Sequence, residues 1–415
     1  MIEEGNENHW GLPYKILTGG LRRGQVLNTV TTRDDTTESV QATIETLFEG
    51  LYPHDNLERD ANTHAQMRVR ARITSPGAET TPFRTAELLE ANNAIALRKA
   101  PGVDGIGPEI VRYVVRRYPT TMLRLYEEYR RARIFPKEWK VGKAVLIPKG
   151  GDKDPRQAKS YRPITLLPVL GKLYEKLINR RLTEFLRESG GLSDRQYGFR
   201  EGMGTMDALL ELKDTVTGSP HKYVIGLFLD IAGAFDNAWW PGILCRLGEI
   251  RCPADIHAIL QDYFRDRKVE YHHGDITIER ALTQGCPQGS VLGTTLWNVI
   301  FDSFLRLRLP RNAKTVAYAD DGLITIGSNN IVTLISDATS VLDHVSAWSR
   351  RARLELSATK TKWVLLKGTH APRWQTYIRL EGTIVERVKE HKYLGILISE
   401  RLNYNSHARD ATQKG

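Results

Sequence analysis

The chain has 415 residues, 41% of them hydrophobic, and a formal net charge of +10. This length allows one large or two ordinary domains with a buried core, and the basic balance suits a polyanion such as nucleic acid, although many basic proteins bind none. The three cysteines include no CxxC pair, which excludes a zinc-ligand set, and the longest apolar run, Tyr223 to Leu229, is far shorter than the roughly 20 residues that span a bilayer. No signal peptide opens the chain, so we expect an intracellular protein without a membrane anchor.

Hydrophobic periodicity and stop signals predict helices in the first half of the chain. We expect these helices at residues 40–51, 85–100, 109–118, 121–133 and 170–187. A turn-rich stretch at 75–82 predicts a linker, and an apolar run at 143–147 predicts a short strand.

The second half of the chain alternates between strand and helix patterns. Strands are expected at 223–229 and 315–318, with helices at 254–265 and 290–307 between them. A helix at 331–353 then precedes strands expected at 363–366, 376–381, 383–388 and 393–398. Helices followed by a mixed region predict an α+β fold.

An aspartate follows each of the two apolar strands. Asp230 comes directly after the first run, at the tip of a strand that we expect to be buried, although a lone aspartate there is more typical of a helix cap. Asp320 and Asp321 follow the second run, where two adjacent carboxylates repel each other and favour a bound cation, although such pairs also occur in exposed turns.

The two aspartate motifs together predict a metal site. If the two strands lie side by side, Asp230 and Asp320 converge, and converging carboxylates bind Mg²⁺. Two metal ions about 3.5–4 Å apart stabilise the attacking and leaving oxygens of an in-line displacement, as polymerases require. We therefore expect two Mg²⁺ ions here, with Mn²⁺ as a substitute.

A compact loop lies between the two aspartate motifs. The residues Gln284 to Ser290 read Gln-Gly-Cys-Pro-Gln-Gly-Ser, so two glycines and a proline leave little side-chain bulk. Such a loop lets a flat ligand approach the backbone closely, although a plain connecting loop has the same composition.

These motifs resemble the successive motifs of reverse transcriptases, in the family's order. Four upstream stretches resemble the non-LTR (LINE-type) retrotransposon branch, namely 99–106, 147–149, 161–164 and 196–200. The segment from Trp10 to Lys15 is similar to the segment before the polymerase in arthropod elements inserted in ribosomal RNA genes. The resemblance covers roughly residues 85 to 400.

The resemblance implies catalytic roles for several residues. Asp230 and Asp320 would be the primary metal ligands, with Asp321 beside them. Lys360 corresponds to a family lysine near the triphosphate, where a lysine could protonate the leaving pyrophosphate. Phe235 would lie under the incoming sugar, where its ring leaves no room for the 2′-hydroxyl of a ribonucleotide.

The resemblance also implies binding roles. Lys149 and Arg162 would grip the triphosphate, whereas Gln288 and Gly289 would contact the incoming nucleotide and template. Two further groups would contact the nucleic acid strands: Phe199 and Arg200 on the template side, and the primer-grip hairpin that contains Tyr393, Leu394 and Gly395.

The family fold is a right-hand polymerase with a ferredoxin-like palm sheet. We expect an N-terminal extension and linker at 1–82, fingers with the first palm elements at 83–222, a palm at 223–398 that includes helices within 254–307, and the start of a thumb at 399–415. Because the chain stops soon after the primer-grip motif, we expect most of the thumb to be missing and processivity to be poor.

The implied partners are an RNA template, a DNA primer or target and deoxynucleoside triphosphates. The protein would act in the nucleus at the integration step. An RNA-dependent RNA polymerase is a rival within the same class, but Phe235 and the Tyr-Ala-Asp-Asp turn argue against it. A catalytically silent nucleic-acid-binding remnant is the other alternative. The sequence leaves the target site and the oligomeric state open.

Overall fold

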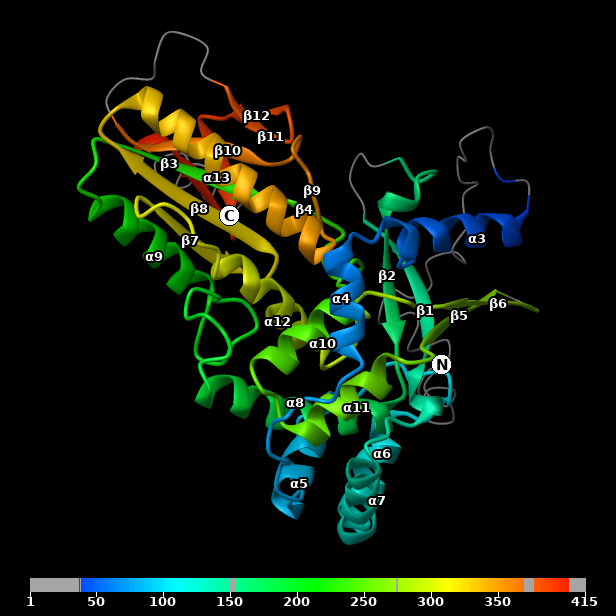
Figure 1. Cartoon of the computed structure of the whole chain (residues 1–415). Coiled ribbons are helices and arrows are strands. Elements are labelled where there is room, and N and C mark those ends of the chain that lie inside the picture. The colour runs from blue at the N-terminus through cyan, green and yellow to red at the C-terminus, as the bar shows by residue number, and fades with distance from the viewer. Residues whose placement is uncertain (1–36, 38, 150–153, 274, 369–376, 403–415) are drawn as a thin grey trace, which may run out of the picture. The chain divides into compact units, whose positions relative to one another are not determined.

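The computed structural model describes residues 37, 39–149, 154–273, 275–368 and 377–402 (Figure 1). The segment from Trp10 to Lys15 and most of the expected start of the thumb lie outside the described residues. The chain divides into two compact units. The first comprises 1–52, 146–163 and 271–278, and the second comprises 53–145, 164–270 and 279–415.

The first unit contains the helix α3, Val40–Leu51, which confirms the prediction for these residues. Its cap, Ser39, accepts a hydrogen bond from the backbone of Ala42. The short helix η3, Ala158–Ser160, packs on α3, and the backbone amide of Lys149 donates to Ser160 at 2.8 Å.

Four strands form a sheet in the order β2-β1-β5-β6. Their bounds are Val141–Pro148 (β1), Tyr161–Leu166 (β2), Lys268–His273 (β5) and Ile276–Ala281 (β6). Within the second unit, β1 pairs in parallel with β5 from Val141 opposite Lys268 to Lys143 opposite Glu270. Only β1 of these four strands was predicted from the sequence.

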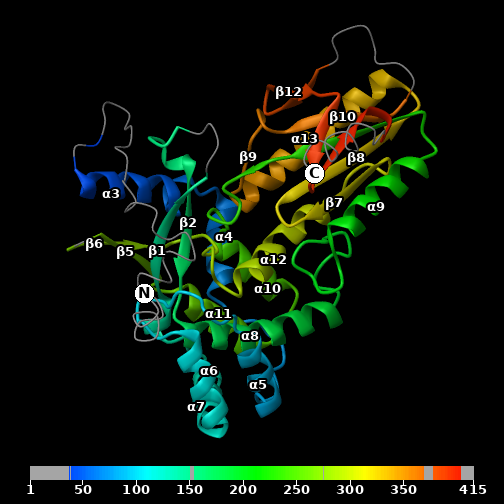
Figure 2. The same ribbon diagram turned by 180° about the vertical axis from the view of Figure 1, so that it is seen from behind.

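The first part of the second unit is helical (Figures 1 and 2). Its helices are α4 (Asn62–Ala71), α5 (Thr85–Asn93), α6 (Pro108–Arg117), α7 (Pro119–Ala132), α8 (Val169–Glu188), α9 (Thr205–Thr217), α10 (Trp240–Glu249) and α11 (Ala254–Phe264). Large aromatic side chains on α7, α8 and α11 pack together as the core of this region, including Tyr126, Tyr174 and Tyr263. The predictions for α6, α7, α8 and α11 hold to within two residues at each end, whereas α4, α9 and α10 were not predicted.

One prediction in this region is wrong. The helix expected at 85–100 ends at Asn93. The adjacent Asn92 is buried and donates its side-chain amide to the backbone of Arg112, and Arg98 has a φ of 56°, which a helix does not allow. The stretch 75–82, predicted to be a linker, is ordered against α11, because both the backbone and the hydroxyl of Thr80 donate to Asp255.

A six-stranded sheet carries the second part of this unit, in the order β11-β12-β10-β3-β8-β7. Its strands are β3 (Tyr223–Leu229), β7 (Ala313–Tyr318), β8 (Asp321–Ser328), β10 (Lys362–Lys367), β11 (Ile378–Leu380) and β12 (Thr383–Arg387). The central strand β3 runs antiparallel to both β8 and β10 and is almost wholly buried. The apolar run of β3 is therefore explained by its central position.

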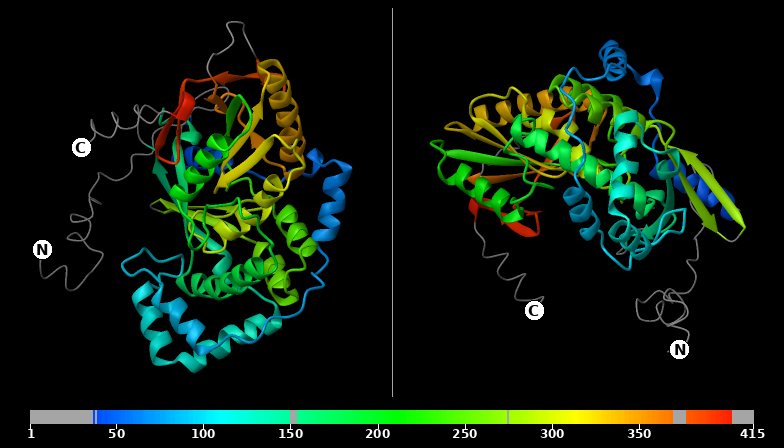
Figure 3. Two further views of the ribbon diagram at one scale, coloured as in Figure 1. Left: turned by 90° about the vertical axis from the view of Figure 1, so that its left-hand side faces the viewer. Right: turned by 90° about the horizontal axis from the view of Figure 1, so that it is seen from below.

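Side chains of the sheet alternate between its two faces. On one face, Val224, Phe228 and Leu323 pack against α9. On the other face lie α12 (Gly293–Leu305) and α13 (Ile331–Ala352), and a Cβ on Gly322 would touch Phe301 and Phe304 of α12. Figure 3 shows α9 and α13 on opposite sides of the sheet.

The strand expected at 393–398 is instead a hairpin. It consists of β13, Glu390–Tyr393, and β14, Ile396–Ser399, joined at Leu394-Gly395. Left-handed backbone at both turn residues, with φ of 49° and 85°, reverses the chain where one strand was expected. The helices and sheets together confirm the predicted α+β class. Within the described residues, no helix is long and apolar enough to cross a membrane.

Candidate active site

One edge of the six-stranded sheet, where β3 ends and β7 turns into β8, brings the predicted aspartates together. Strand β3 pairs with β8 so that Leu229 lies opposite Gly322, which puts the next residue, Asp230, beside Asp321. Strands β7 and β8 form a hairpin in which Tyr318 pairs with Asp321, so Ala319 and Asp320 are the two turn residues. The aspartates therefore meet, but not in the predicted way, because the strands expected to lie side by side, β3 and β7, are separated by β8, which was not predicted.

Like charges perturb the carboxyl groups at this edge. Loss of hydration and then repulsion from Asp320 and Asp230 raise the pKa of Asp321 to about 6. Loss of hydration also raises the pKa of Asp320, with a further contribution from Asp230. A site that disfavours its own negative charge is suited to a cation.

Asp230 is held by the segment that precedes β10. Its backbone amide donates to the hydroxyl of the buried Thr361 at 3.3 Å, and its carbonyl accepts from the backbone of Ser357 at 2.9 Å. The ammonium of Lys360 lies 3.5 Å from the carboxylate oxygen Oδ1, and this oxygen is buried without a hydrogen bond. Lys360 is 68% exposed, so the pair stands at the surface.

The turn that bears Asp320 is strained and is held from outside. Ala319 has a φ of 57°, a conformation that favours glycine. The side chain of Gln196 is buried, donates to the Ala319 carbonyl at 3.2 Å and accepts from the Ala319 amide at 3.0 Å. Its neighbour Tyr197 donates a backbone hydrogen bond to Ala317, so the segment runs beside β7. The motif at 196–200 begins with Gln196, but the sequence alone assigned no role to this residue.

Gly198 allows this close approach. A Cβ at this position would lie 2.1 Å from the backbone nitrogen of Ala319, so no larger residue fits without moving the turn. The Gly198 amide donates to Gln196, and the Gly198 carbonyl accepts from the buried side chain of Asn298 on α12.

The loop from Gln284 to Ser290 is fixed on both sides. The carbonyl of Gln288 accepts from the Thr165 amide at 2.8 Å, and a Cβ on Gly289, whose φ is 134°, would meet the Thr165 carbonyl at 2.2 Å. Beyond the loop, the buried carboxylate of Glu175 accepts from the Ser290 hydroxyl and from the amides of the next two residues. Glu175 therefore orders the start of α12, a role that the sequence did not reveal.

Comparison of the chain with known protein families identifies the domain that carries these aspartates. The family of reverse transcriptases (RNA-dependent DNA polymerases) matches residues 147–398. The chain belongs to the reverse transcriptase family. The match confirms the resemblance that the motifs indicated, and the helical region and sheet agree with a fingers and palm fold.

Curated relatives from insect retrotransposons match over most of the chain. A retrovirus-related Pol polyprotein from the type-1 retrotransposable element R1 of Bradysia coprophila is 33% identical over 98% of this chain and 39% of its own length. A putative 115 kDa protein in the type-1 retrotransposable element R1DM of Drosophila melanogaster is 35% identical over 79% of this chain and 32% of its own length. A probable RNA-directed DNA polymerase from transposon BS of the same species is 31% identical over 80% of this chain and 37% of its own length. The chain thus spans less than half the length of these relatives.

The carboxylates of this reverse transcriptase domain fit a divalent cation. Asp230 offers an oxygen that is buried and without a hydrogen bond, and the two neighbouring aspartates have raised pKa values. Within the described residues, no group of three or more His, Cys, Asp or Glu side chains is close enough to enclose a metal ion by itself. Carboxylate oxygens are ligands that hard divalent cations take, so the chemistry of these three side chains fits such an ion.

The aromatic residues near the site also lie together. The ring of Phe235 lies edge-to-face with that of Phe199, with 5.9 Å between centroids. The other neighbour of Phe235 is the buried Trp297 of α12, with 5.3 Å between centroids. Arg200, expected to face the template, donates to the carbonyls of Ser193 and Gln196. Arg200 therefore supports the loop that carries Gln196.

The remaining predicted residues belong to other elements. Lys149 and Arg162 are part of the first unit, where the Lys149 ammonium donates to the Lys159 carbonyl at 2.7 Å and Arg162 is exposed. In the β13–β14 hairpin, Tyr393 is buried against Phe228 and the α9 face of the sheet, and Leu394 and Gly395 form the turn.

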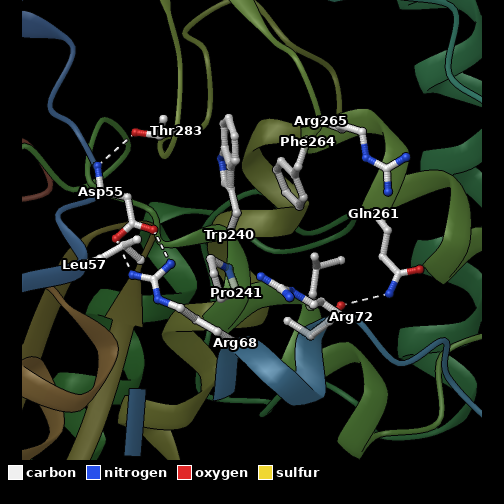
Figure 4. Close-up of a pocket in the computed structure, with 12 residues that line it drawn as sticks. Asp55, Leu57, Arg68, Arg72, Trp240, Pro241, Gln261, Phe264, Arg265 and Thr283 are labelled. Carbon is white, nitrogen blue, oxygen red and sulfur yellow. Dashed lines mark hydrogen bonds and ion pairs between the residues drawn. The ribbon is translucent and has the colours of Figure 1, made fainter. Parts of the chain in front are cut away.

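A separate pocket of about 490 Å³ lies in the second unit and is lined by residues of α4, α10 and α11 (Figure 4). None of the predicted site residues lines it. Its wall includes the stacked rings of Trp240 and Phe264, and the indole nitrogen of Trp240 donates to the carbonyl of Gly285. This wall therefore supports the Gln284 to Ser290 loop from behind.

Proposed function

We propose that this chain catalyses template-directed addition of deoxynucleotides to a primer 3′-hydroxyl, with release of pyrophosphate. RNA is the proposed template, and DNA is a second one. The observation that carries the proposal is the meeting of Asp230 with Asp320 and Asp321 at one edge of the sheet, beside a loop and an aromatic ring that the family uses for the nucleotide. The Drosophila melanogaster relative named as an RNA-directed DNA polymerase supports the same reaction.

The carboxylates of Asp230, Asp320 and Asp321 would hold two Mg²⁺ ions, or Mn²⁺ in their place. When bound, the ions polarise the reacting oxygens and neutralise the charge of the triphosphate. The carboxylates themselves fix where this charge is neutralised, because β3 and the β7–β8 turn hold them at the sheet edge. The repulsion that helps to raise the pKa values of Asp320 and Asp321 falls when cations bind.

The other residues of the proposed site bind and orient the nucleotide. Lys360 has an exposed ammonium 3.5 Å from Asp230, where it can donate a proton to the departing pyrophosphate. Phe235 supports the deoxyribose and leaves no room for a 2′-hydroxyl. Gln288 and Gly289 are proposed to contact the incoming nucleotide and the template, and Lys149 and Arg162 to supply positive charge for the triphosphate.

The strands of nucleic acid would lie across the same domain. Phe199 and Arg200 are proposed to face the template, and Tyr393, Leu394 and Gly395 to support the primer. We propose fingers at 83–222, a palm at 223–398 and the beginning of a thumb after 398. In an intact element the primer would be a nick in chromosomal DNA, and the nucleus would be the site of this step.

Primer extension on an RNA template with Mg²⁺ tests the proposal. The wild-type chain is expected to add deoxynucleotides, and Asp320→Asn to reduce the rate by at least about 10³-fold, because the variant removes a charged ligand without changing the shape of the turn. Asp194→Asn is the matched control, since this aspartate is 97% exposed and lies outside the sheet edge. Incorporation that survives in Asp320→Asn would contradict the proposed site. Template binding without incorporation by the wild type would favour a catalytically silent remnant.

A further inference from the structure

Phe199 has a backbone conformation that a bulky residue rarely adopts. Its φ is 57°, in the left-handed region where asparagine and glycine predominate, and yet the residue is 51% exposed. Burial in a core therefore does not explain why a phenylalanine stands here. A strained conformation that the surroundings enforce is a reason to look for a role in function.

The surroundings of Phe199 enforce this conformation from both sides. On the preceding residue, the carbonyl of Gly198 accepts a hydrogen bond at 2.9 Å from Asn298, which is buried on α12. On the following residue, the guanidinium of Arg200 donates to the Ser193 carbonyl at 2.7 Å. The backbone on either side of the ring is thus tied to other parts of the domain.

The ring that is held in this way contacts Phe235. The two rings meet edge-to-face at an interplanar angle of 86°, an arrangement that the quadrupoles of aromatic rings favour. Phe235 also contacts Trp297, and Trp297 is fully buried. Phe235 is therefore supported by a rigid ring of the core and by the ring of Phe199, which projects from the strained loop.

We propose that Phe199 is a positioning residue that holds Phe235 in place and so contributes to the choice of deoxynucleotides over ribonucleotides. This inference rests on the proposed function, because it assigns Phe235 to the wall of the sugar pocket. A ring rejects a 2′-hydroxyl only while it cannot move aside. The contact with Phe199 removes one direction in which Phe235 could move.

The test measures kcat/KM for a deoxynucleotide and for the ribonucleotide of the same base, in single additions to one primer on an RNA template. The ratio of the two values is expected to fall about three- to tenfold in Phe199→Ala, which is the size of effect that loss of one aromatic pair produces. Phe199→Tyr keeps the ring and is expected to keep the ratio. Because both nucleotides are measured on the same preparation, any misfolded fraction cancels from the ratio.

Two further variants separate positioning from other roles. Phe199→Gly removes the ring and relieves the strained backbone, so it is expected to lower the ratio as Phe199→Ala does while folding at least as stably. Met206→Ala removes another apolar side chain that is 59% exposed and is expected to leave the ratio unchanged. In a Phe235→Ala background, Phe199→Ala is expected to cause no further fall, because its effect passes through Phe235.

The outcomes distinguish this inference from the proposed function. Slower addition of both nucleotides by Phe199→Ala with an unchanged ratio would overturn the inference and leave a template-contacting role. A fall in the ratio that persists in the Phe235→Ala background would also overturn it. If the wild type adds neither nucleotide, the proposed function has failed and the inference fails with it.

Discussion

Two hairpin turns differ in how they are held: the β7–β8 turn of the six-stranded sheet and the turn of the separate β13–β14 hairpin. The β7–β8 turn has one left-handed residue, Ala319, at its first position, and this position normally requires glycine. The β13–β14 turn has left-handed backbone at both Leu394 and Gly395, and its glycine stands where the turn requires one. A Cβ on Gly395 would meet no atom within 4 Å. Both turns thus hold a non-glycine residue in left-handed backbone, but Ala319 of the first turn is buried, whereas Gly395 of the second adjoins open space.

The difference shows where the catalytic geometry comes from. The turn that carries Asp320 keeps its shape through Gln196, which lies 123 residues away along the chain. The β13–β14 turn is closed by the pairing of its own two strands, and Leu394 packs against the nearby core of the sheet. We therefore expect changes far from the aspartates to impair catalysis, whereas changes in the second turn act locally.

Among changes that keep all three aspartates, the largest expected effect comes from filling the space between Gly198 and the catalytic turn. In Gly198→Ala the new methyl group would lie 2.1 Å from the Ala319 nitrogen, so the backbone must move. We expect nucleotide addition to fall about 100-fold, since displacements of about 1 Å have effects of this size. Gly204→Ala is the control, because its methyl group would meet only the Asp207 side chain, at 3.6 Å. Equal rates for the two variants would show that the turn does not depend on this contact.

A smaller effect is expected from Gln196→Leu. This variant keeps the volume but leaves the amide and carbonyl of Ala319 and the amide of Gly198 without their partner. Unfolding free energy should fall by about 3 kcal/mol, given a cost of about 1–3 kcal/mol for each unsatisfied group and partial relaxation. Denaturant unfolding measures this value, and single-nucleotide addition should slow about tenfold in the folded fraction. A variant as stable and as active as the wild type would show that Gln196 does not hold the catalytic turn.

The carboxyl group of Asp321, at the end of the β7–β8 turn, makes the stability of the protein depend on pH. The folded pKa of Asp321, about 6, lies above the unfolded value near 4, so the folded state binds more protons between these pH values. Stability of the metal-free protein is therefore lost as the pH rises through about 6. Asp321→Asn should raise the melting temperature at pH 8 and change it little at pH 4. A rise of the same size at both pH values would contradict the sign of this shift.

The smallest effect is expected at the second turn. Gly395→Ala places a methyl group in open space at a φ of 85°, so only the backbone preference opposes it. We expect a loss of about 1 kcal/mol in unfolding free energy and less than a threefold change in single-nucleotide addition. Thermal unfolding measures the loss of stability, and single-nucleotide addition at saturating primer measures the change in rate. A loss of activity comparable to that of Gly198→Ala would erase the distinction between the turns.

The parts of the site that could be predicted are those that local sequence determines. Asp230 and Asp320 each follow a short apolar run, and two buried strands that both end in a carboxylate indicate a shared site at one edge of a sheet. Helices with long periodic patterns, such as 169–188 and 331–352, were also predicted to within a residue at each end.

The parts that could not be predicted depend on contacts between distant residues. Gln196 and Glu175 are ordinary polar residues in the sequence, and only the fold shows that each is buried against backbone groups of a catalytic motif. The linker expected at 75–82 is ordered by Asp255 on α11 for the same reason. At 393–398 the apolar pattern alone predicted one strand, because the apolar residues on both sides of Leu394-Gly395 resemble a continuous run, whereas the family resemblance predicted the hairpin.

The central claim is that the sheet edge with Asp230, Asp320 and Asp321 binds the catalytic cations. Mn²⁺ binding to the chain with primer and template, followed by electron paramagnetic resonance, tests it without any turnover. We predict saturable binding that Mg²⁺ displaces, and at least tenfold weaker binding in Asp320→Asn than in the control Asp194→Asn. Equal affinity in the two variants would contradict the claim, because the cations would then be held elsewhere.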